Sequence, residues 1–252
     1  MNTEKEVVVD GITVLNRRNM EVGTSYQEFL IPFKKADGRQ VRVKVCGTSP
    51  TSVLGDWNCT NVRNFGLRHD YLLVINAGIY IDPFSVEADG ITIIDGKILK
   101  DITAELFLTE LHVLGITAAG DFKTYFYESA ENILADGCIY ALTGFVPLIK
   151  DGLRVKPEAL ATCKHWDKRH PRQIVGRFFN GDYFTFCCDG RKENENGMTL
   201  QECADTILQD FGDEVAFAFN LDGGGSTQTM IGKRLMNPNV EGRPVPNVIA
   251  FE

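Results

Sequence analysis

The chain has 252 residues, enough for one large domain or two small ones, and its 44% apolar and 24% charged residues are ordinary for a globular protein. Its formal net charge of −8 argues against nucleic acid or an anionic membrane as the main partner. No apolar run approaches the roughly 20 residues of a membrane-spanning helix, and the charged N-terminus lacks the apolar core of a secretory signal. We therefore expect no membrane span and a cytoplasmic location.

The seven cysteines are odd in number, and no Cys-x-x-Cys motif occurs. This pattern predicts reduced, buried thiols and disfavours a disulfide framework or a structural zinc site. The nearest approach to zinc-ligand spacing is Cys163-x-His165 with His170 close by, and the second cysteine pair of a structural site is missing.

Turn signals divide the first half of the chain into hairpins. We expect hairpins around Asp37-Gly38, Asp95-Gly96 and Gly120-Asp121, because each pair separates apolar or alternating segments. Residues 26–33 and 40–45 would form the first of these hairpins, 90–99 the second, and 111–117 with 122–127 the third. Strands are also predicted at 12–15 and 71–75, a helix plus loop within 50–70, and a short helix from Ser129 to Leu134.

The second half has sharper signals. Asn180-Gly181 predicts a hairpin of residues 174–179 and 183–188, and short apolar segments stand at 139–142 and 147–149. Thr199 and Glu202 have the spacing of a capping box, and an apolar stripe follows to Phe211, so a helix is expected until Gly212. Buried strands are predicted at 215–221 and 245–251, and two short strands join at Gly232-Lys233. Residues 154–169 give no clear pattern.

Many hairpins with few helices predict an α+β fold of mixed, largely antiparallel sheets with a few packed helices. We expect a single domain over residues 1–252. Asp-Gly hairpins recur in both halves, which suggests two similar sub-lobes within it.

One polar stretch stands out at the end of the predicted strand 215–221. Asn220 and Leu221 lead to Asp222, three glycines (Gly223, Gly224 and Gly225) and the hydroxyls of Ser226 and Thr227. Residues without Cβ let a ligand approach the backbone and leave N–H groups to face an anion. The alternative is a tight turn that needs positive φ.

Other polar groups stand at the ends of predicted strands or beside them: Asn76, Arg172, and Asp189 with Arg191. Together with Asp222 they supply two carboxylates, two guanidiniums and backbone donors. Guanidiniums match phosphate oxygens, and carboxylates stabilise positive charge at an anomeric carbon. The set therefore suits a ligand that is both sugar and phosphate.

Several ordered motifs resemble the phosphodiester glycosidase family, the uncovering-enzyme type of N-acetylglucosamine-1-phosphodiester α-N-acetylglucosaminidase. They run from about residue 70 to the C-terminus: 76–80, 147–152, His170-Pro171-Arg172, Asp189-Gly190-Arg191, 197–200, 220–226, Asn237-Pro238 and Arg243. Ala77, Ile79 and Tyr80 depart from the family's Gly, Phe and Phe, which bears on the sugar subsite. Family members often enter the secretory pathway, so the absence of a signal suggests a bacterial cytoplasmic or phage-encoded member.

The resemblance implies hydrolysis of the bond between an anomeric carbon and a phosphodiester phosphate. Asp222 would be the nucleophile or electrostatic stabiliser, Asp189 would orient Arg191 or activate water, and His170 would be a secondary acid. The remaining residues would bind the substrate: Arg172, Arg191, Asn76, Tyr80, Asn220, Gly223, Gly224, Gly225, Ser226 and Thr227. No cofactor is required in this interpretation, although carboxylates at Asp189 and Asp222 suit Ca²⁺ or Mg²⁺.

Simpler interpretations stay open for the individual residues. Asp189 and Arg191 could form a turn with a surface ion pair, Arg172 could be solvated, Asn76 could cap its strand, and His170 could be structural. A non-catalytic module that binds phosphosugars or glycans is the main alternative function. A P-loop and a serine hydrolase are disfavoured, because no Gly-Lys-Ser/Thr follows the glycines and Gly224 to Gln228 lacks the closing glycine of Gly-x-Ser-x-Gly.

Overall fold

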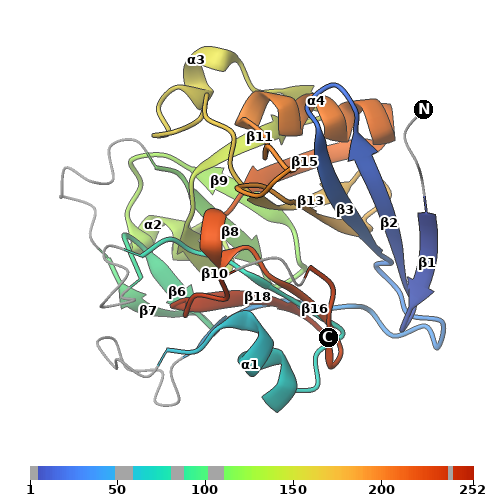
Figure 1. Ribbon diagram of the computed structural model, residues 1–252. Coiled ribbons are helices and arrows are strands. Elements are labelled where there is room, and N and C mark those ends of the chain that lie inside the picture. Colours follow the sequence, from blue (N-terminus) through green and yellow to red (C-terminus); the bar gives the residue numbers. More distant parts are fainter. Residues whose placement is uncertain (1–4, 49–58, 81–87, 102–110, 238–240) are drawn as a thin grey trace.

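The computed structural model of the protein describes residues 5–48, 59–80, 88–101, 111–237 and 241–252. Three antiparallel sheets of eight, five and five strands carry the fold, and short helices lie on their outer sides (Figure 1). This arrangement confirms the predicted α+β class. No helix in the described segments is long and apolar enough to cross a membrane.

The eight-stranded sheet, called the large sheet here, joins the N-terminal strands to the central and C-terminal ones. Its order is β1 (Lys5–Val9), β2 (Ile12–Asn19), β3 (Thr24–Ile31), β14 (Tyr183–Cys188), β13 (Arg172–Phe178), β15 (Val215–Asn220), β11 (Val146–Lys150) and β12 (Leu153–Arg154).

The two five-stranded sheets complete the framework. The β10 sheet has the order β7 (Lys97–Lys100), β6 (Thr92–Ile94), β10 (Cys138–Thr143), β8 (Val113–Thr117) and β9 (Phe122–Tyr125). The β5 sheet has the order β17 (Arg234–Leu235), β16 (Thr229–Ile231), β5 (Leu73–Asn76), β18 (Asn247–Phe251) and β4 (Val43–Gly47).

One apolar core lies between the three sheets. Phe29 and Phe219 of the large sheet, Ile75 of the β5 sheet and Leu114 of the β10 sheet are fully buried in the same cluster. Burial of such side chains is the main favourable term in folding. The inner faces of all three sheets therefore share a single core.

Each sheet has a helix on its other face. Residues of α4 (Leu200–Phe211) pack with the large sheet, those of α1 (Val62–Arg68) with the β5 sheet, and those of α2 (Ala130–Ala135) with the β10 sheet. The shorter α3 (Pro157–Leu160) lies beside α4, and the 3₁₀ turns η2 (Gly212–Glu214) and η3 (Gly224–Ser226) flank β15.

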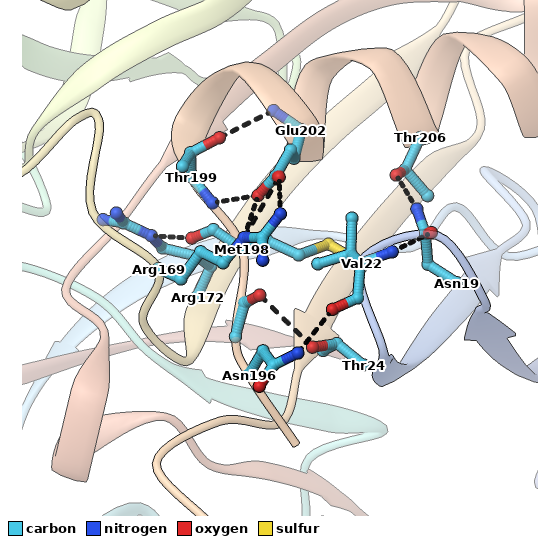
Figure 2. Close-up of polar contacts among 11 residues, drawn as sticks. Asn19, Val22, Thr24, Arg169, Arg172, Asn196, Met198, Thr199, Glu202 and Thr206 are labelled. Atoms are coloured by element: carbon cyan, nitrogen blue, oxygen red, sulfur yellow. Dashed lines mark hydrogen bonds and ion pairs between the residues drawn. The ribbon is translucent and has the colours of Figure 1, made fainter. Parts of the chain in front are cut away.

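Capping confirms the predicted helix starts. Thr199 accepts a hydrogen bond from the N–H of Glu202, and the Glu202 carboxylate accepts one from the N–H of Thr199, which completes the capping box (Figure 2). Ser129 caps α2 by accepting a hydrogen bond from the N–H of Asn132. Residues 50–58 of the predicted helix-plus-loop segment lie outside the described residues, and α1 occupies its later part.

The predicted hairpin around Asp37-Gly38 is wrong. Strand β3 pairs with β2 and β14, whereas β4 pairs with β18 in the β5 sheet, and Lys34 and Gln40 make only an isolated bridge. The turn residues were identified correctly, but the two segments diverge into different sheets because their apolar faces pack against different partners.

Burial agrees with the prediction for five of the seven cysteines, whereas Cys46 and Cys59 are half-buried. Five thiols are buried, those of Cys138, Cys163, Cys187, Cys188 and Cys203.

Candidate active site

The glycine loop lies where the large sheet meets the β5 sheet. Strand β15 is flanked by β13 and β11, and it delivers Asp222 beyond its last residue. The N–H of Asp222 donates to the carbonyl of Ala77, just after β5, over 3.0 Å. The site therefore rests on strand ends from two sheets, which makes it a rigid place to hold a ligand.

Close packing explains the three glycines. A Cβ on Gly223 would lie 2.6 Å from the carbonyl oxygen of Pro171, and one on Gly225 would lie 2.6 Å from Nε of Arg243. Gly224 has φ +60°, and a Cβ there would lie 3.1 Å from the guanidinium nitrogens of Arg191. The glycines let two arginines approach the backbone of the loop.

Most N–H groups of the loop already have acceptors. Those of Gly223, Gly224, Ser226 and Thr227 donate to the Asp222 carboxylate and to the carbonyls of Pro171, Gly223 and Gly224, respectively. At most the N–H of Gly225 remains for a ligand. A phosphate would thus depend on the arginines more than on the nest of amides that the sequence predicted.

The Asp222 carboxyl is held in a buried, polar position. Its Oδ1 accepts the N–H of Gly223 at 2.8 Å, and its Oδ2 is buried without a hydrogen-bond partner among the described residues. Burial raises the pKa of Asp222 to about 6, opposed by hydrogen bonds from Ser226 and Gly223 and by the charges of Arg243 and Arg191. A bound ligand is one explanation for an unpartnered buried oxygen, and a carboxyl whose pKa is raised by burial is a candidate catalytic group.

Arg191 reaches over the loop from the end of β14. It adopts φ 59°, a left-handed conformation that is uncommon for a residue with a side chain. Its Nη2 lies 3.2 Å from Nδ1 of His170. Arginine only donates, so Nδ1 is the acceptor, which agrees with the pKa of His170, lowered to about 4 by burial and the nearby arginines. At neutral pH the imidazole is therefore uncharged. This geometry favours a role for His170 in orienting the Arg191 side chain.

A second guanidinium, that of Arg243, faces the loop, although the motif that contains it implied no role for it. Arg243 lies against Gly225, and its guanidinium hydrogen-bonds to Tyr80 and to Glu241 at 2.6 Å. It stands in one of the motifs quoted above. Its separation of about twenty residues from Asp222 along the chain gives no indication that the two side chains meet.

Arg172 has a different environment from the one expected. Its Nε donates to the carbonyl of Met198 at 2.9 Å, and its Nη2 donates to the carbonyls of His165 and Lys168 at 2.8 and 2.6 Å. The side chain is buried beneath the start of α4 (Figure 2). These bonds favour a positioning role, because they hold the strand that presents Pro171 to the loop.

Asp189 directly follows β14, two residues before Arg191. It lines a hollow of about 380 Å³ together with Lys5, Arg17, Gln27 and Asn237. Its N–H donates to the carbonyl of Ser25 on β3. The carboxylate of Glu241 lies against Gly225 and pairs with Arg243.

Three further predicted residues surround Asp222. The buried Asn76 amide donates to the carbonyl of Asp222 at 2.6 Å and accepts the N–H of Gln228 at 3.1 Å. Asn220 donates to the carbonyl of Leu221, and its Oδ1 is buried without a partner in the described chain, as is Oγ1 of Thr227. Asn76 is thus engaged with the backbone, whereas Asn220 and Thr227 each keep one unused polar atom.

The described part of the chain holds no group of three His, Cys, Asp or Glu side chains arranged to bind a metal ion. Two guanidiniums act on the Asp222 carboxyl, and like charge opposes a divalent cation there. This arrangement does not favour the Ca²⁺ or Mg²⁺ ion that carboxylates at Asp189 and Asp222 would allow.

Comparison with known proteins places the chain among relatives. A family model described as phosphodiester glycosidase matches residues 69–252. The chain is 26% identical over 189 residues to the SPbeta prophage-derived uncharacterized protein YomE of Bacillus subtilis (strain 168), which covers 74% of this chain and 28% of that protein. This chain thus spans just over a quarter of the length of that relative.

Two solved structures have a similar fold. The catalytic domain of zebrafish N-acetylglucosamine-1-phosphodiester alpha-N-acetylglucosaminidase, auto-inhibited by its pro-peptide, matches with a TM-score of 0.69 and 20% identity, over 100% of this chain and 82% of that one. A hypothetical protein from Synechocystis matches with a TM-score of 0.70 and 14% identity, over 98% and 63% of the two chains.

Proposed function

Since the chain belongs to the phosphodiester glycosidase family, we propose that it hydrolyses the bond between a sugar's anomeric carbon and a phosphodiester phosphate. The observation that carries the proposal is the Asp222 carboxyl, which has a buried oxygen without a partner in the described chain and lies within the electrostatic influence of Arg243 and Arg191. The prophage origin of one relative supports a phage-encoded protein.

The charges suggest how the work is divided. Positive charge develops at an anomeric carbon as the bond to oxygen breaks, and the ionised Asp222 carboxylate would stabilise it or attack it. The departing phosphate is a weak base, so it needs neutralisation more than a proton, and Arg191 and Arg243 would supply that. Water ends on the anomeric carbon, its released proton goes to solvent, and the products are a free sugar and a phosphomonoester.

The other residues would support these groups. His170 would orient Arg191, and Tyr80 would hold Arg243. Asn220, Ser226 and Thr227 would bind substrate hydroxyls or fix the carboxylate, and Arg172 would hold the strand beneath the loop. We propose no direct chemical step for Asp189.

The test is a panel of methyl phosphodiesters of glucose, galactose and N-acetylglucosamine, together with nucleotide sugars, read by release of free sugar. We expect turnover of at least one substrate. Asp222→Asn should reduce kcat by about 100-fold or more, because the negative carboxylate that stabilises positive charge at the anomeric carbon is lost. A melting temperature no lower than that of the native protein would show that the variant folds.

Two outcomes would contradict the proposal. Measurable binding without turnover of any panel member would favour the alternative, a phosphosugar or glycan-binding module. Turnover that Asp222→Asn leaves nearly unchanged would remove this carboxylate from the reaction.

A further inference from the structure

Three aromatic rings stand together outside the glycine loop, and we call His112, Phe126 and Tyr127 the aromatic platform. The His112 and Phe126 rings stack with centroids 4.5 Å apart and planes 20° apart. The Phe126 and Tyr127 rings meet edge to face at 4.2 Å. Phe126 is 39% exposed and Tyr127 67%, so two of the three rings offer apolar surface to solvent.

The backbone holds one of these rings in a costly conformation. Tyr127 has φ 56°, and a non-glycine residue in this region costs on the order of 1 kcal/mol or more. It stands in the connection between β9 and α2. A strained residue that also exposes a large aromatic ring suggests a purpose other than packing.

The platform is tied by backbone bonds to the strand that carries Asp222. The N–H of Phe145 donates to the carbonyl of Asn220 at 3.1 Å, and the N–H of His112 donates to the carbonyl of Phe145 at 2.9 Å. Phe145 lies where the chain passes from the β10 sheet to the large sheet. Hydrogen-bonded strands lie about 4.8 Å apart, so these two steps leave the backbone of His112 no more than roughly 10 Å from that of Asn220. That separation is comparable with the length of a short glycan.

The chemistry of the platform suits a sugar ring. Burial lowers the pKa of His112 to about 4, so its imidazole is uncharged at neutral pH. Aromatic faces pack against apolar groups, and the C–H face of a pyranose is such a surface. An anionic aglycone would find no cation among these three side chains.

We propose that the aromatic platform is a glycan subsite, on which a second pyranose ring of the substrate stacks while the first lies at Asp222. This inference rests on the proposed function, because it places the second ring relative to the bond that is cleaved. His112, Phe126 and Tyr127 then determine preference for substrates longer than one sugar.

The experiment compares methyl phosphodiesters of a monosaccharide and of the disaccharide that extends it, for each sugar in the panel. In the variant Phe126→Ala/Tyr127→Ala, we expect KM for the disaccharide substrate to rise about tenfold with kcat unchanged, as the loss of one or two stacking contacts implies. Kinetics on the monosaccharide substrate should stay as in the native protein. The matched control is Phe179→Ala, which removes a ring that is 64% exposed at the β13–β14 turn.

A second measurement separates this inference from the proposed function. In this measurement, calorimetry follows the binding of chitotriose and of maltotriose to the Asp222→Asn variant. The readout is binding, so it does not depend on hydrolysis. Binding that the platform variant weakens, without turnover of any phosphodiester, would retain the subsite and reject the activity. If the native protein is active and the platform variant changes KM equally for the monosaccharide and disaccharide substrates, or for neither, the subsite would be rejected and the activity retained.

Discussion

Asp222 carries an electrostatic cost that can be measured. Its pKa of about 6 exceeds the value near 3.9 of an unfolded chain. Between these values the folded state keeps a proton that the unfolded state has lost, so this residue lowers the free energy of unfolding as pH rises from about 4 to about 6. Two pKa units correspond to roughly 2–3 kcal/mol. We therefore expect Asp222→Asn to be more stable than the native protein at pH 7 by up to that amount.

The measurement is urea unfolding of both proteins between pH 4 and 7. Other carboxyl groups act in the opposite direction, since hydrogen bonds and ion pairs lower the pKa of Glu195 and Glu202 despite their burial, so only the difference between the two proteins isolates Asp222. The difference should grow from near zero at pH 4 to its full value above pH 6. Parallel pH profiles would show that the carboxyl ionises normally in the fold.

At this scale the sequence predicted residue types better than their partners. Asp222 and the glycines follow from an apolar strand that ends in polar residues, and Arg191 follows from its position after a strand. Arg172 and Arg243 look equivalent in the sequence, and only packing separates them. One donates to three backbone carbonyls beneath α4, whereas the other lies over Gly225. Side-chain direction in a loop depends on contacts that spacing does not contain.

At the scale of elements, Arg172 connects the start of β13 to the N-terminal end of α4 (Figure 2). Replacing it by methionine would leave three backbone carbonyls without their donor in a buried setting. Each orphaned acceptor costs about 1–3 kcal/mol, with partial relief from water, so we expect Arg172→Met to lower the free energy of unfolding by roughly 2–4 kcal/mol. Thermal and urea unfolding would measure this loss.

Arg191→Met is the matched control for that variant. Its side chain is exposed and bonded mainly to His170, so its free energy of unfolding should change by less than about 0.5 kcal/mol while turnover falls. If Arg172→Met were instead stable but inactive, the result would favour a contact between Arg172 and the substrate phosphate, as the sequence suggested.

Elements were more predictable than their pairing. The capping box of α4, the Asn180-Gly181 hairpin and the strand 215–221 appear where local chemistry indicated. The hairpin predicted around Asp37-Gly38 was wrong because a turn signal indicates a change of chain direction and does not indicate which strands pair. Pairing between β4 and β18 joins residues some two hundred positions apart, which turn chemistry cannot encode.

At the scale of the whole molecule, three sheets surround one core, and the candidate site occupies a junction between two of them. The sequence suggested two similar sub-lobes, and its local patterns did not indicate three sheets with a shared interior. A single domain over the whole chain stays a prediction. Since the loop after β15 bonds to residues beside β5, the geometry at Asp222 depends on how the large sheet and the β5 sheet are held together.

Asn76 is the side chain that makes this connection. Its buried amide joins β5 to the carbonyl of Asp222 and to the N–H of Gln228. Asn76→Ala would leave both groups unsatisfied, so we expect a loss of roughly 2–4 kcal/mol in the free energy of unfolding and a fall in kcat as the carboxylate loses its fixed position. Urea unfolding and steady-state kinetics would measure the two effects together.

A buried polar residue of the large sheet provides the comparison for Asn76. The Thr185 hydroxyl is buried and has no hydrogen-bond partner in the described chain, so Thr185→Val removes a polar group without orphaning another. We expect this variant to be as stable as the native protein or more so, with normal turnover. If Asn76→Ala instead raised KM alone and kept full stability, the amide would bind substrate, as its place in the sequence first indicated, and the junction would be held by other contacts.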